Sequence, residues 1–427
     1  MIAKLLAAAL LAATIAGAQI RVLPQPSKSP LITLRIVFTA GAALDPADRP
    51  GVANLAAAML AQGGSRELAY KQILDAMFPM AASVSYQVDK EMTTFSTATH
   101  LDNLEPFYKI FRAMLLDPGW RQEDFERLRD DAVNFLRVSL RGSNDEELGK
   151  EVLYHSIFAG HPYGRHNAGN VSALERITLS DLREFYRQHY RQPNLMIAIA
   201  GDFPPEFLAR LKQDFRKLPE DRHLTGRLPA PKALAGRKVT IIEKDTRSVA
   251  FSLGFPIAVR RGHPDYAALL VASSYLGQHR SSGGRLFERM RELRGLNYGD
   301  YAYIEHFPRG MFQLEPDPNL ARQHQIFQLW IRPVEPPNSH FALRLALYEL
   351  DRLIRDGIPP ADFERTREFL SKYVNVLTKN KTAELGYRLD SLFYDIPDYR
   401  TYLTRALEGL TPERVHHAIR WRLKPEN

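Results

Sequence analysis

Hydrophobic positions recur along this chain with two periods, and each period predicts a different kind of element. Apolar residues at every second position indicate half-buried strands, whereas apolar residues three or four positions apart indicate amphipathic helices. Strands are predicted at Leu31–Thr39, Ser83–Val88, Met92–Thr99, Leu195–Ala200, Val239–Glu243, Val249–Phe255 and Gln325–Arg332. Helices are predicted at Gly51–Gln62, Tyr70–Phe78, Asn103–Leu116, Glu123–Ser139, Glu146–Ile157, Leu179–His189, Asp265–Gly277, Gly284–Leu293, Phe341–Arg355 and Ala361–Leu377.

The order of these elements divides the chain into two halves of comparable size. Between residues 218 and 236 the sequence is rich in Pro, Ala and Gly, and no hydrophobic period continues through it, which is typical of a linker. We therefore predict an N-terminal domain at 19–217, a linker at 218–236 and a C-terminal domain at 237–427. Strands mixed with runs of helices favour the α+β class, with a largely antiparallel sheet covered by helices in each half.

The first 18 residues have the composition of a cleavable secretory signal. Lys4 precedes an apolar run, Leu5–Ile15, and the small residues Ala16, Gly17 and Ala18 follow it. Since this run is too short to span a bilayer, we predict cleavage after Ala18 and a periplasmic or secreted protein without a transmembrane segment. The absence of cysteine among 427 residues excludes disulfides and thiolate chemistry. The net charge of +8 is spread over helices, which argues against nucleic acid as a partner.

Four segments carry a resemblance to a known family. They are Gly51–Leu60, His161-Pro-Tyr-Gly164, Asp181–Tyr190 with Asn194–Asp202, and Arg285–Tyr298, and they occur in the family's order. Together they resemble insulinase-like M16 peptidases, and most closely the short bacterial M16B type related to mitochondrial processing peptidase. The resemblance implies two tandem homologous domains of the M16/LuxS-metallopeptidase type. It also implies that two such chains close around an unfolded peptide.

The resemblance further implies that the zinc site of the family is degenerate here. Active members bind zinc through His-x-x-Glu-His and a downstream Glu. Asn54 stands at the first His, Ala57 at the Glu, Ala58 at the second His, and the third ligand falls near Phe135–Arg137. Catalytic zinc needs about three N, O or S side-chain ligands, which these residues do not supply. We therefore expect no cofactor in this chain and zinc in a partner subunit.

The second half keeps the family pattern better. Arg291 and Tyr298 match a pair that contacts the substrate backbone and stabilises the tetrahedral intermediate in the family. A guanidinium offers fixed donors to a carbonyl, and a phenol can donate to a developing oxyanion. The structural alternative is that Arg291 is a solvated charge beside Glu292 and Arg294, and that Tyr298 packs on a neighbouring strand residue.

These residues support three hypotheses of function. The first is an exported, zinc-less subunit of a heterodimeric metallopeptidase that binds peptides and supplies Arg291 and Tyr298 to a chain with an intact His-x-x-Glu-His. The second is a noncatalytic peptide-binding or scaffold protein, for which a homo-oligomer is the expected assembly. The third is a self-sufficient peptidase whose metal binds to one helix face, at Glu147, Glu151 and His155. Ligands spaced along one helix are poorly placed for tetrahedral zinc.

Overall fold

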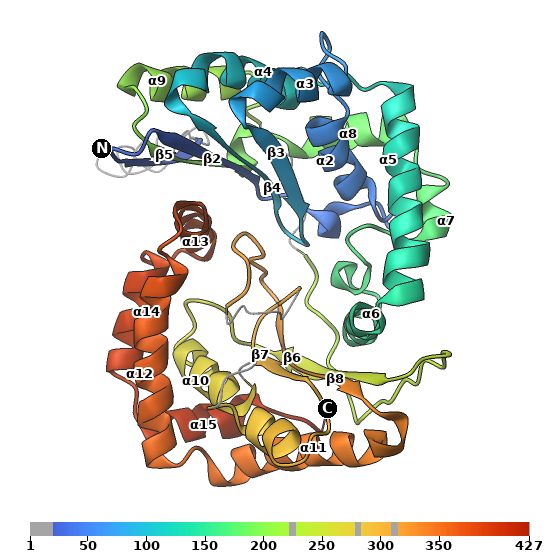
Figure 1. Ribbon diagram of the computed structural model, residues 1–427, viewed down its shortest axis with the longest axis vertical. Helices are drawn as coiled ribbons and strands as arrows, with labels where there is room; N and C mark the ends of the chain where they lie inside the picture. Colours follow the sequence, from blue (N-terminus) through green and yellow to red (C-terminus); the bar gives the residue numbers. More distant parts are fainter. Residues whose placement is uncertain (1–19, 222–227, 278–282, 309–314, 427) are drawn as a thin grey trace, which may run out of the picture.

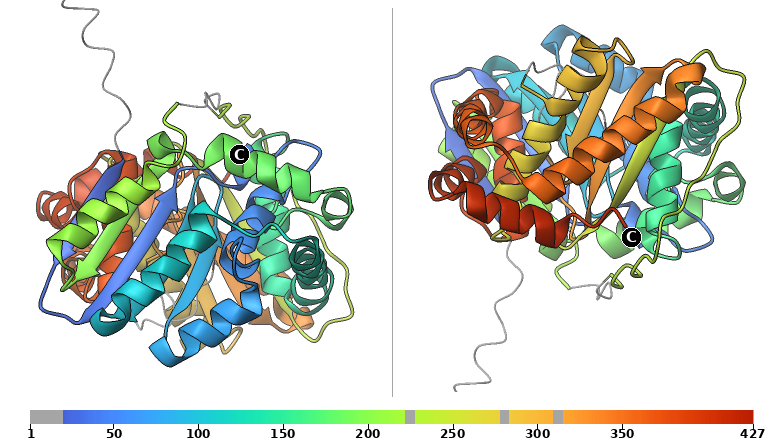
Figure 2. Two further views of the ribbon diagram at one scale, coloured as in Figure 1. Left: turned by 90° about the horizontal axis from the view of Figure 1, so that it is seen from above. Right: turned by 90° about the horizontal axis from the view of Figure 1, so that it is seen from below.

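The computed structural model describes residues 20–221, 228–277, 283–308 and 315–426. It confirms an α+β fold built from two halves, each with one sheet and helices on the outer face of that sheet (Figure 1). The two further views in Figure 2 look onto these outer helices from above and from below. The two sheets therefore face one another across the middle of the molecule. The predicted signal at residues 1–18 lies outside the described residues.

The N-terminal half contains a five-stranded sheet in the order β1-β5-β2-β4-β3. Its strands are β1 (Arg21–Pro26), β2 (Leu31–Phe38), β3 (Ser83–Val88), β4 (Thr93–His100) and β5 (Leu195–Gly201). All neighbouring pairs are antiparallel except β1 and β5, which run parallel. Strand β5 is buried along its whole length because it lies between β1 and β2 and is covered on both faces.

Helices and short turns complete this half. The α-helices are α2 (Val52–Gln62), α3 (Tyr70–Met77), α4 (Leu104–Leu116), α5 (Gln122–Asn134), α6 (Asp145–Ile157), α7 (Val171–Leu174), α8 (Leu179–His189) and α9 (Pro205–Phe215). A nine-residue π-helix, η5 (Phe135–Ser143), continues α5. The 3-10 turns are η2 (Ala42–Leu44), η3 (Phe78–Met80), η4 (Leu101–Asn103), η6 (Pro162–Gly164) and η7 (Gln192–Asn194).

The C-terminal half contains a three-stranded antiparallel sheet in the order β6-β8-β7. Its strands are β6 (Val249–Ile257), β7 (Gly299–Tyr303) and β8 (Gln325–Val334). Its helical elements are α10 (Tyr266–Gly277), the π-helix η8 (Phe287–Glu292), the 3-10 turn η9 (Pro336–Asn338), α11 (Ser339–Asp356), α12 (Pro360–Leu377), α13 (Lys381–Tyr394), α14 (Tyr399–Glu408) and α15 (Pro412–Arg422). Helix α15 packs on α10 as α8 packs on α2 in the first half.

Apolar packing joins the two halves to each other. The apolar face of α13 packs on β2 and β5 of the first half, where Leu385 and Leu389 contact a cluster that includes Val37 and Met196. Helix α6 of the first half lies against β6 of the second. Since a fully buried leucine contributes about 1.5–3 kcal/mol, these contacts fix the halves relative to one another.

A buried ion pair reinforces this contact. Nε of Arg322 donates to Oδ2 of Asp89 at 2.6 Å, and Nη2 of the same arginine donates to Oδ1. Both side chains are buried, and Asn167 donates a further hydrogen bond to Asp89 at 3.1 Å. Nearby, Nη1 of Arg35 donates to the amide oxygen of Asn319 at 2.6 Å. The loop before β8 is thus anchored in the N-terminal half.

Two predictions about secondary structure are corrected. The segment Val239–Glu243, predicted to be a strand, has no regular structure and lies exposed on the surface. It pairs with no strand among the described residues, and an alternating pattern alone cannot form a ladder. The predicted helices at Glu123–Ser139 and Gly284–Leu293 are partly π-helical, at η5 and η8. Among the described helices, none has the combined length and apolar character needed to cross a membrane.

Candidate functional site

Helix α2 carries three of the positions that the sequence assigns to the lost zinc motif. Its N-terminus is held by Asp45, whose carboxylate accepts the backbone N–H groups of Gly51 and Ala53, both at 2.7 Å. Burial raises the pKa of Asp45 to about 7, although these two hydrogen bonds oppose the shift. The helix therefore starts at a buried, unusually basic carboxyl group.

The side chains on this helix do not form a zinc site. Ala57 and Ala58 are buried in the hydrophobic core of the first half, and only the half-buried Asn54 has a polar side chain. Phe135, at the expected third ligand, is 43% exposed, and its ring centroid lies 6.1 Å from that of His166. Because alanine and phenylalanine side chains have no donor atoms for a metal, this set of residues does not fit zinc.

The alternative metal face on α6 is not assembled either. Lys150 donates to Glu147 at 2.6 Å, and Nδ1 of His155 is hydrogen-bonded to the carbonyl of Gly164 at 3.0 Å. Oε2 of Glu151 is buried without a hydrogen-bond partner. In the described part of the chain, no group of three or more His, Cys, Asp or Glu side chains could hold a metal ion. The structure therefore uses Glu147 and His155 for separate internal contacts.

The structure does bring Arg291 and Tyr298 together. The guanidinium carbon of Arg291 lies 4.6 Å from the centroid of the Tyr298 ring and 5.0 Å from that of Phe287. Arg291 is half-buried on the π-helix η8, and Tyr298, 48% exposed, immediately precedes β7. Such contacts between a cation and aromatic faces are worth about 0.5–2 kcal/mol, so they restrict the orientation of the guanidinium.

Local backbone geometry sets this spacing. The N–H of Gly295 donates to the carbonyl of Arg291 at 2.8 Å, and the N–H of Tyr298 donates to the carbonyl of Arg332 on β8 at 3.2 Å. Gly295 has a φ of +60°, a left-handed conformation that glycine adopts without strain. The chain therefore leaves η8 in a tight turn, and the seven-residue spacing places the two side chains against each other.

The hydrogen bonding of Arg291 differs from that of its neighbours. Nε of Arg285 and Nε of Arg289 both donate to the buried carboxylate of Glu349, at 3.1 and 2.9 Å. Arg294 donates to the carbonyl of Arg289 at 2.8 Å. Within the described residues, by contrast, the guanidinium of Arg291 makes aromatic contacts and forms no hydrogen bond or ion pair. Its five N–H donors therefore have no acceptor among the residues that the structure describes.

Two buried polar residues that the sequence did not single out lie next to this pair. Asn297 donates to the carboxylate of Asp300 and, at 3.0 Å, to the carbonyl of Gly299. Burial raises the pKa of Asp300 to about 6, while the hydrogen bond from Asn297 and the charge of Arg291 oppose this rise. The charges of Asp300 and Arg291 therefore influence each other although the two side chains form no ion pair. In the sequence, only its position two residues after Tyr298 could have indicated that Asp300 lies near this pair.

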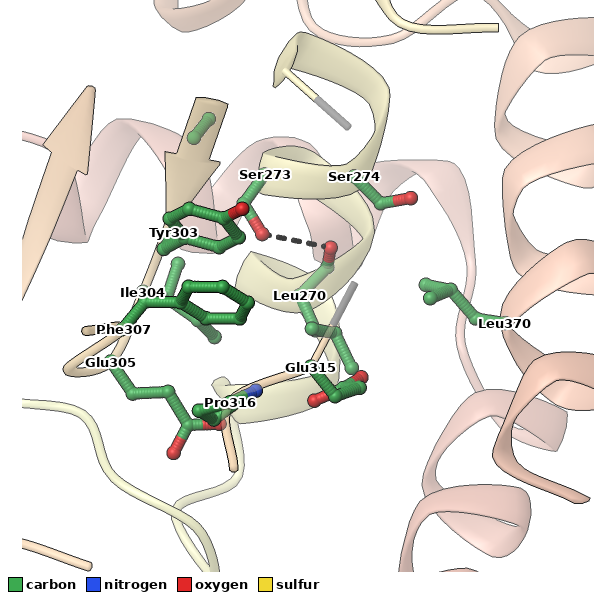
Figure 3. A pocket seen from close by; sticks show the side chains of 11 residues that line it. Leu270, Ser273, Ser274, Tyr303, Ile304, Glu305, Phe307, Glu315, Pro316 and Leu370 are labelled. Atoms are coloured by element: carbon green, nitrogen blue, oxygen red, sulfur yellow. Dashed lines mark hydrogen bonds between the residues drawn. The ribbon is translucent and has the colours of Figure 1, made fainter. Parts of the chain in front are cut away.

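Three cavities lie away from this pair, and the largest of them, of about 290 Å³, is lined mainly by polar residues of α13 and the start of α14. The remaining two are smaller. One, of about 150 Å³, lies between α6 and the Arg322 loop and is lined by Lys90, Lys150 and Tyr154, among others. The other, of about 20 Å³, lies between α10 and the loop after β7, where Ser273 donates to the carbonyl of Leu270 at 3.1 Å (Figure 3). The smaller cavity has room for about one water molecule. Neither has the size of a groove for an extended peptide.

Comparison with known proteins gives consistent matches over most of the chain. Residues 21–170 match the family described as insulinase (peptidase family M16), and residues 176–370 match the peptidase M16 inactive domain. An uncharacterized zinc protease of Mycobacterium tuberculosis is 26% identical over 241 residues, 55% of this chain and 53% of that protein. The non-peptidase homolog YmxG of Helicobacter pylori is 23% identical over 291 residues, 66% of each chain. The chain spans about half the length of the first of these relatives and two thirds of the second.

Solved structures show the same fold. A peptidase M16 inactive domain from Pseudomonas fluorescens superposes with a TM-score of 0.82 at 24% identity, covering 96% of this chain and 94% of that one. A protease from Helicobacter pylori gives a TM-score of 0.80 at 14% identity, covering 97% and 96%. The periplasmic protease PqqL from Escherichia coli gives 0.70 at 17% identity and matches 93% of this chain, but only 42% of that protein.

Proposed function

The chain belongs to the insulinase-like M16 peptidase family, and we propose that it is the zinc-less subunit of an exported, two-chain metallopeptidase. In this proposal it binds peptides and presents Arg291 and Tyr298 to a partner M16 chain that carries His-x-x-Glu-His. The observation that carries the proposal is the state of Arg291, whose guanidinium contacts two aromatic rings and forms no hydrogen bond within the described part of the chain. A structural arginine would be bound to a carboxylate, as Arg285 and Arg289 are.

The geometry supports a role in contacting a peptide at its reacting carbonyl. The planar guanidinium can donate two parallel hydrogen bonds to backbone oxygens, and Tyr298 places a phenol on the same exposed edge. In a partner's active site, such donors would stabilise negative charge on the carbonyl oxygen as water adds to the peptide bond. The partner supplies the zinc chemistry in this proposal, because the residues of α2 do not.

A sheet edge in the first half supports peptide binding. Strand β3 is an outer strand that pairs with β4 on one side and with no described strand on the other. An extended peptide can add to such an edge through main-chain hydrogen bonds. The export part of the proposal depends on the sequence of residues 1–18, which resembles a cleavable signal.

A second candidate is a noncatalytic peptide-binding or scaffold protein with the same fold. It is favoured by the loss of donor atoms at Ala57 and Ala58 and by the name of the related non-peptidase homolog from Helicobacter pylori. The two candidates share peptide binding and differ in whether Arg291 and Tyr298 change the rate of hydrolysis by a complex.

The test begins with affinity purification of the tagged chain from its native envelope and identification of co-purifying proteins. The complex with a recovered M16 partner is then reconstituted and assayed with a quenched fluorescent peptide. Tyr298→Phe should lower kcat by roughly 10²–10³ if its hydroxyl donates in the transition state. Arg294→Ala, an exposed arginine three residues from Arg291, is the matched control and should change kcat less than about twofold. An unchanged kcat for Tyr298→Phe would favour the scaffold.

A further inference from the structure

Helix α6 lies where the two halves meet (Figure 1), and the cavity of about 150 Å³ beside it has walls from both halves. Lys90, Glu151 and Asn167 line the cavity from the first half, and Arg322 lines it from the second. A water molecule takes up about 30 Å³ in the liquid, so there is room for a ligand larger than one water. The lining residues are separate from the site around Arg291.

Two residues in the wall hold polar atoms that lack a hydrogen-bond partner. Nε and Nη2 of Arg322 donate to Asp89, whereas its Nη1 is buried and has no acceptor among the described residues. Nδ2 of Asn167 donates to the carbonyl of Val88 and to Asp89, both at 3.1 Å, which fixes the amide and leaves its buried Oδ1 without a donor. Such atoms are uncommon in native proteins and indicate that a further group can bind there.

Lys90 and Glu151 bring opposite charges to the same cavity. Lys90 is 5% exposed, and its ammonium group donates to the carbonyl of Arg165, which uses one of its three donors. Oε2 of Glu151 is buried and accepts no hydrogen bond from the described residues. Burial, followed by the charge of Arg322, lowers the pKa of Lys90 to about 7, and burial raises the pKa of Glu151. Both ions are therefore desolvated without a full set of hydrogen bonds.

Two other cations in the wall have contacts of their own. Lys150 pairs with Glu146 at 2.9 Å and with Glu147 at 2.6 Å. Arg165 donates to the backbone carbonyl of Asp45 at 3.1 Å, and its charge also acts on the carboxyl group of that residue. Contacts within the protein thus already use Lys150 and Arg165.

The two histidines in the wall add no positive charge at pH 7. Burial, together with the charge of Lys90, lowers the pKa of His166 to about 4. Burial and the charge of Arg322 hold the pKa of His306 well below its ordinary value. A simple anion in the cavity would therefore meet the carboxylate of Glu151, and a simple cation would meet the ammonium group of Lys90. A ligand that carries both charges matches both groups.

We propose that this cavity binds a small zwitterion, an α-amino acid whose carboxylate accepts from Lys90 and Arg322 and whose ammonium group donates to Glu151 and Asn167. One carbon atom separates the two charged groups of an α-amino acid, so a single small molecule can satisfy donors and acceptors of one cavity. Because its contacts come from both halves, the bound molecule also joins them. This inference does not rest on the proposed function.

The side chain of the ligand is expected to be small and apolar. Leu140, Phe307 and Pro308 complete the wall and offer no charged group to a side chain. L-alanine is therefore the probe. Propionate and ethylamine are matched control ligands, since propionate lacks the ammonium group and ethylamine lacks the carboxylate.

Binding is measured by equilibrium dialysis of radiolabelled L-alanine against the whole chain at pH 7, with the two analogues as competitors at constant ionic strength. We expect saturable binding with a Kd below about 1 mM, and each analogue should compete at least about tenfold more weakly than unlabelled L-alanine. Propionate that competes as well as L-alanine would show a site for simple anions and overturn the inference. The absence of saturable binding at about 10 mM would overturn it too.

Substitutions assign the two charged contacts. Glu151→Gln keeps the shape of the side chain and removes its charge, so it should weaken binding of L-alanine about tenfold or more. Lys90→Met should weaken it by a similar factor. Glu368→Gln and Lys372→Met, which alter an exposed ion pair on α12, are the matched controls and should leave binding unchanged. Native affinity in folded Glu151→Gln would contradict the inference. The comparison of ligands needs no substitution, so it decides the question even if Lys90→Met fails to fold.

Discussion

Breaking the buried ion pair between Asp89 and Arg322 should weaken the contact between the two halves more than removing the whole pair. Both groups are buried, and the bidentate contact spans the halves. Removing one partner of such a pair leaves an uncompensated buried charge and costs about 3–5 kcal/mol. Replacing both partners by neutral residues of similar shape removes that charge. The summed losses of stability of the single variants Asp89→Asn and Arg322→Met should therefore exceed the loss of stability of the double variant.

The magnitude follows from a double-mutant cycle. If each single variant loses about 3–5 kcal/mol and the double variant loses roughly 2–4 kcal/mol, the coupling energy is roughly 2 kcal/mol or more. Unfolding in urea is followed by the fluorescence of Trp330, which is buried on β8 with the ammonium group of Lys150 3.6 Å from its ring centroid. Replacing the other two tryptophans by phenylalanine leaves Trp330 as the only reporter of this interface. Losses that add within about 0.5 kcal/mol would refute the reasoning.

The same pair predicts a dependence on pH. Burial raises the pKa of Asp89, but the charge and hydrogen bonds of Arg322 outweigh burial and hold this pKa well below its ordinary value. A carboxyl group with a depressed pKa in the folded state stabilises the fold above its unfolded pKa of about 3.9 and loses that contribution as the pH falls. The stability advantage of the native protein over Asp89→Asn should therefore be complete at pH 7 and shrink below about pH 4.

Two further predictions concern burial and titration. Leu389→Ala, at the contact of α13 with the first sheet, should lower the free energy of unfolding by about 2–5 kcal/mol, whereas Leu293→Ala at an exposed leucine should change it by less than about 0.5 kcal/mol. Burial, with the nearby charge of Glu305, raises the pKa of Glu315 to about 8. Since the folded state then holds a proton that the unfolded state releases, stability should fall as pH rises from about 4.5 to 8, and urea unfolding of Glu315→Gln should show a smaller fall. Parallel profiles for the two proteins would contradict this assignment.

The sequence predicted those parts of the fold that depend on local pattern. The periods around Leu31–Thr39 and Leu195–Ala200 predicted β2 and β5 because an alternating or continuous apolar run is enough to identify a strand in a covered sheet. The same rule was wrong for Val239–Glu243, where the pattern is equally clear but the segment pairs with no described strand. Periodicity indicates that a segment favours the strand conformation, but a strand forms only where another strand can pair with it.

Contacts between residues far apart in the sequence could not be predicted from the sequence. Asp89 and Arg322 are separated by 233 positions, and no local period relates them. The pair Arg291 and Tyr298 was accessible from the resemblance of Arg285–Tyr298 to the family's segment. The roles of Phe287 and Asp300 beside them could not be predicted. In the sequence each is an ordinary helix or strand residue, and only the ring contacts and the burial distinguish them.

The two halves differ in what their equivalent surfaces can offer to another molecule. On α2, Ala57 and Ala58 are packed into the core. A larger polar side chain at either position would displace buried neighbours and leave an unsatisfied polar group. On η8, Arg291 is accessible, oriented by Phe287 and Tyr298, and bound to no carboxylate among the described residues. A π-helical segment like η8 is unusual and often occurs at functional sites. In the proposed function, the donors offered to a peptide substrate therefore come from the second half.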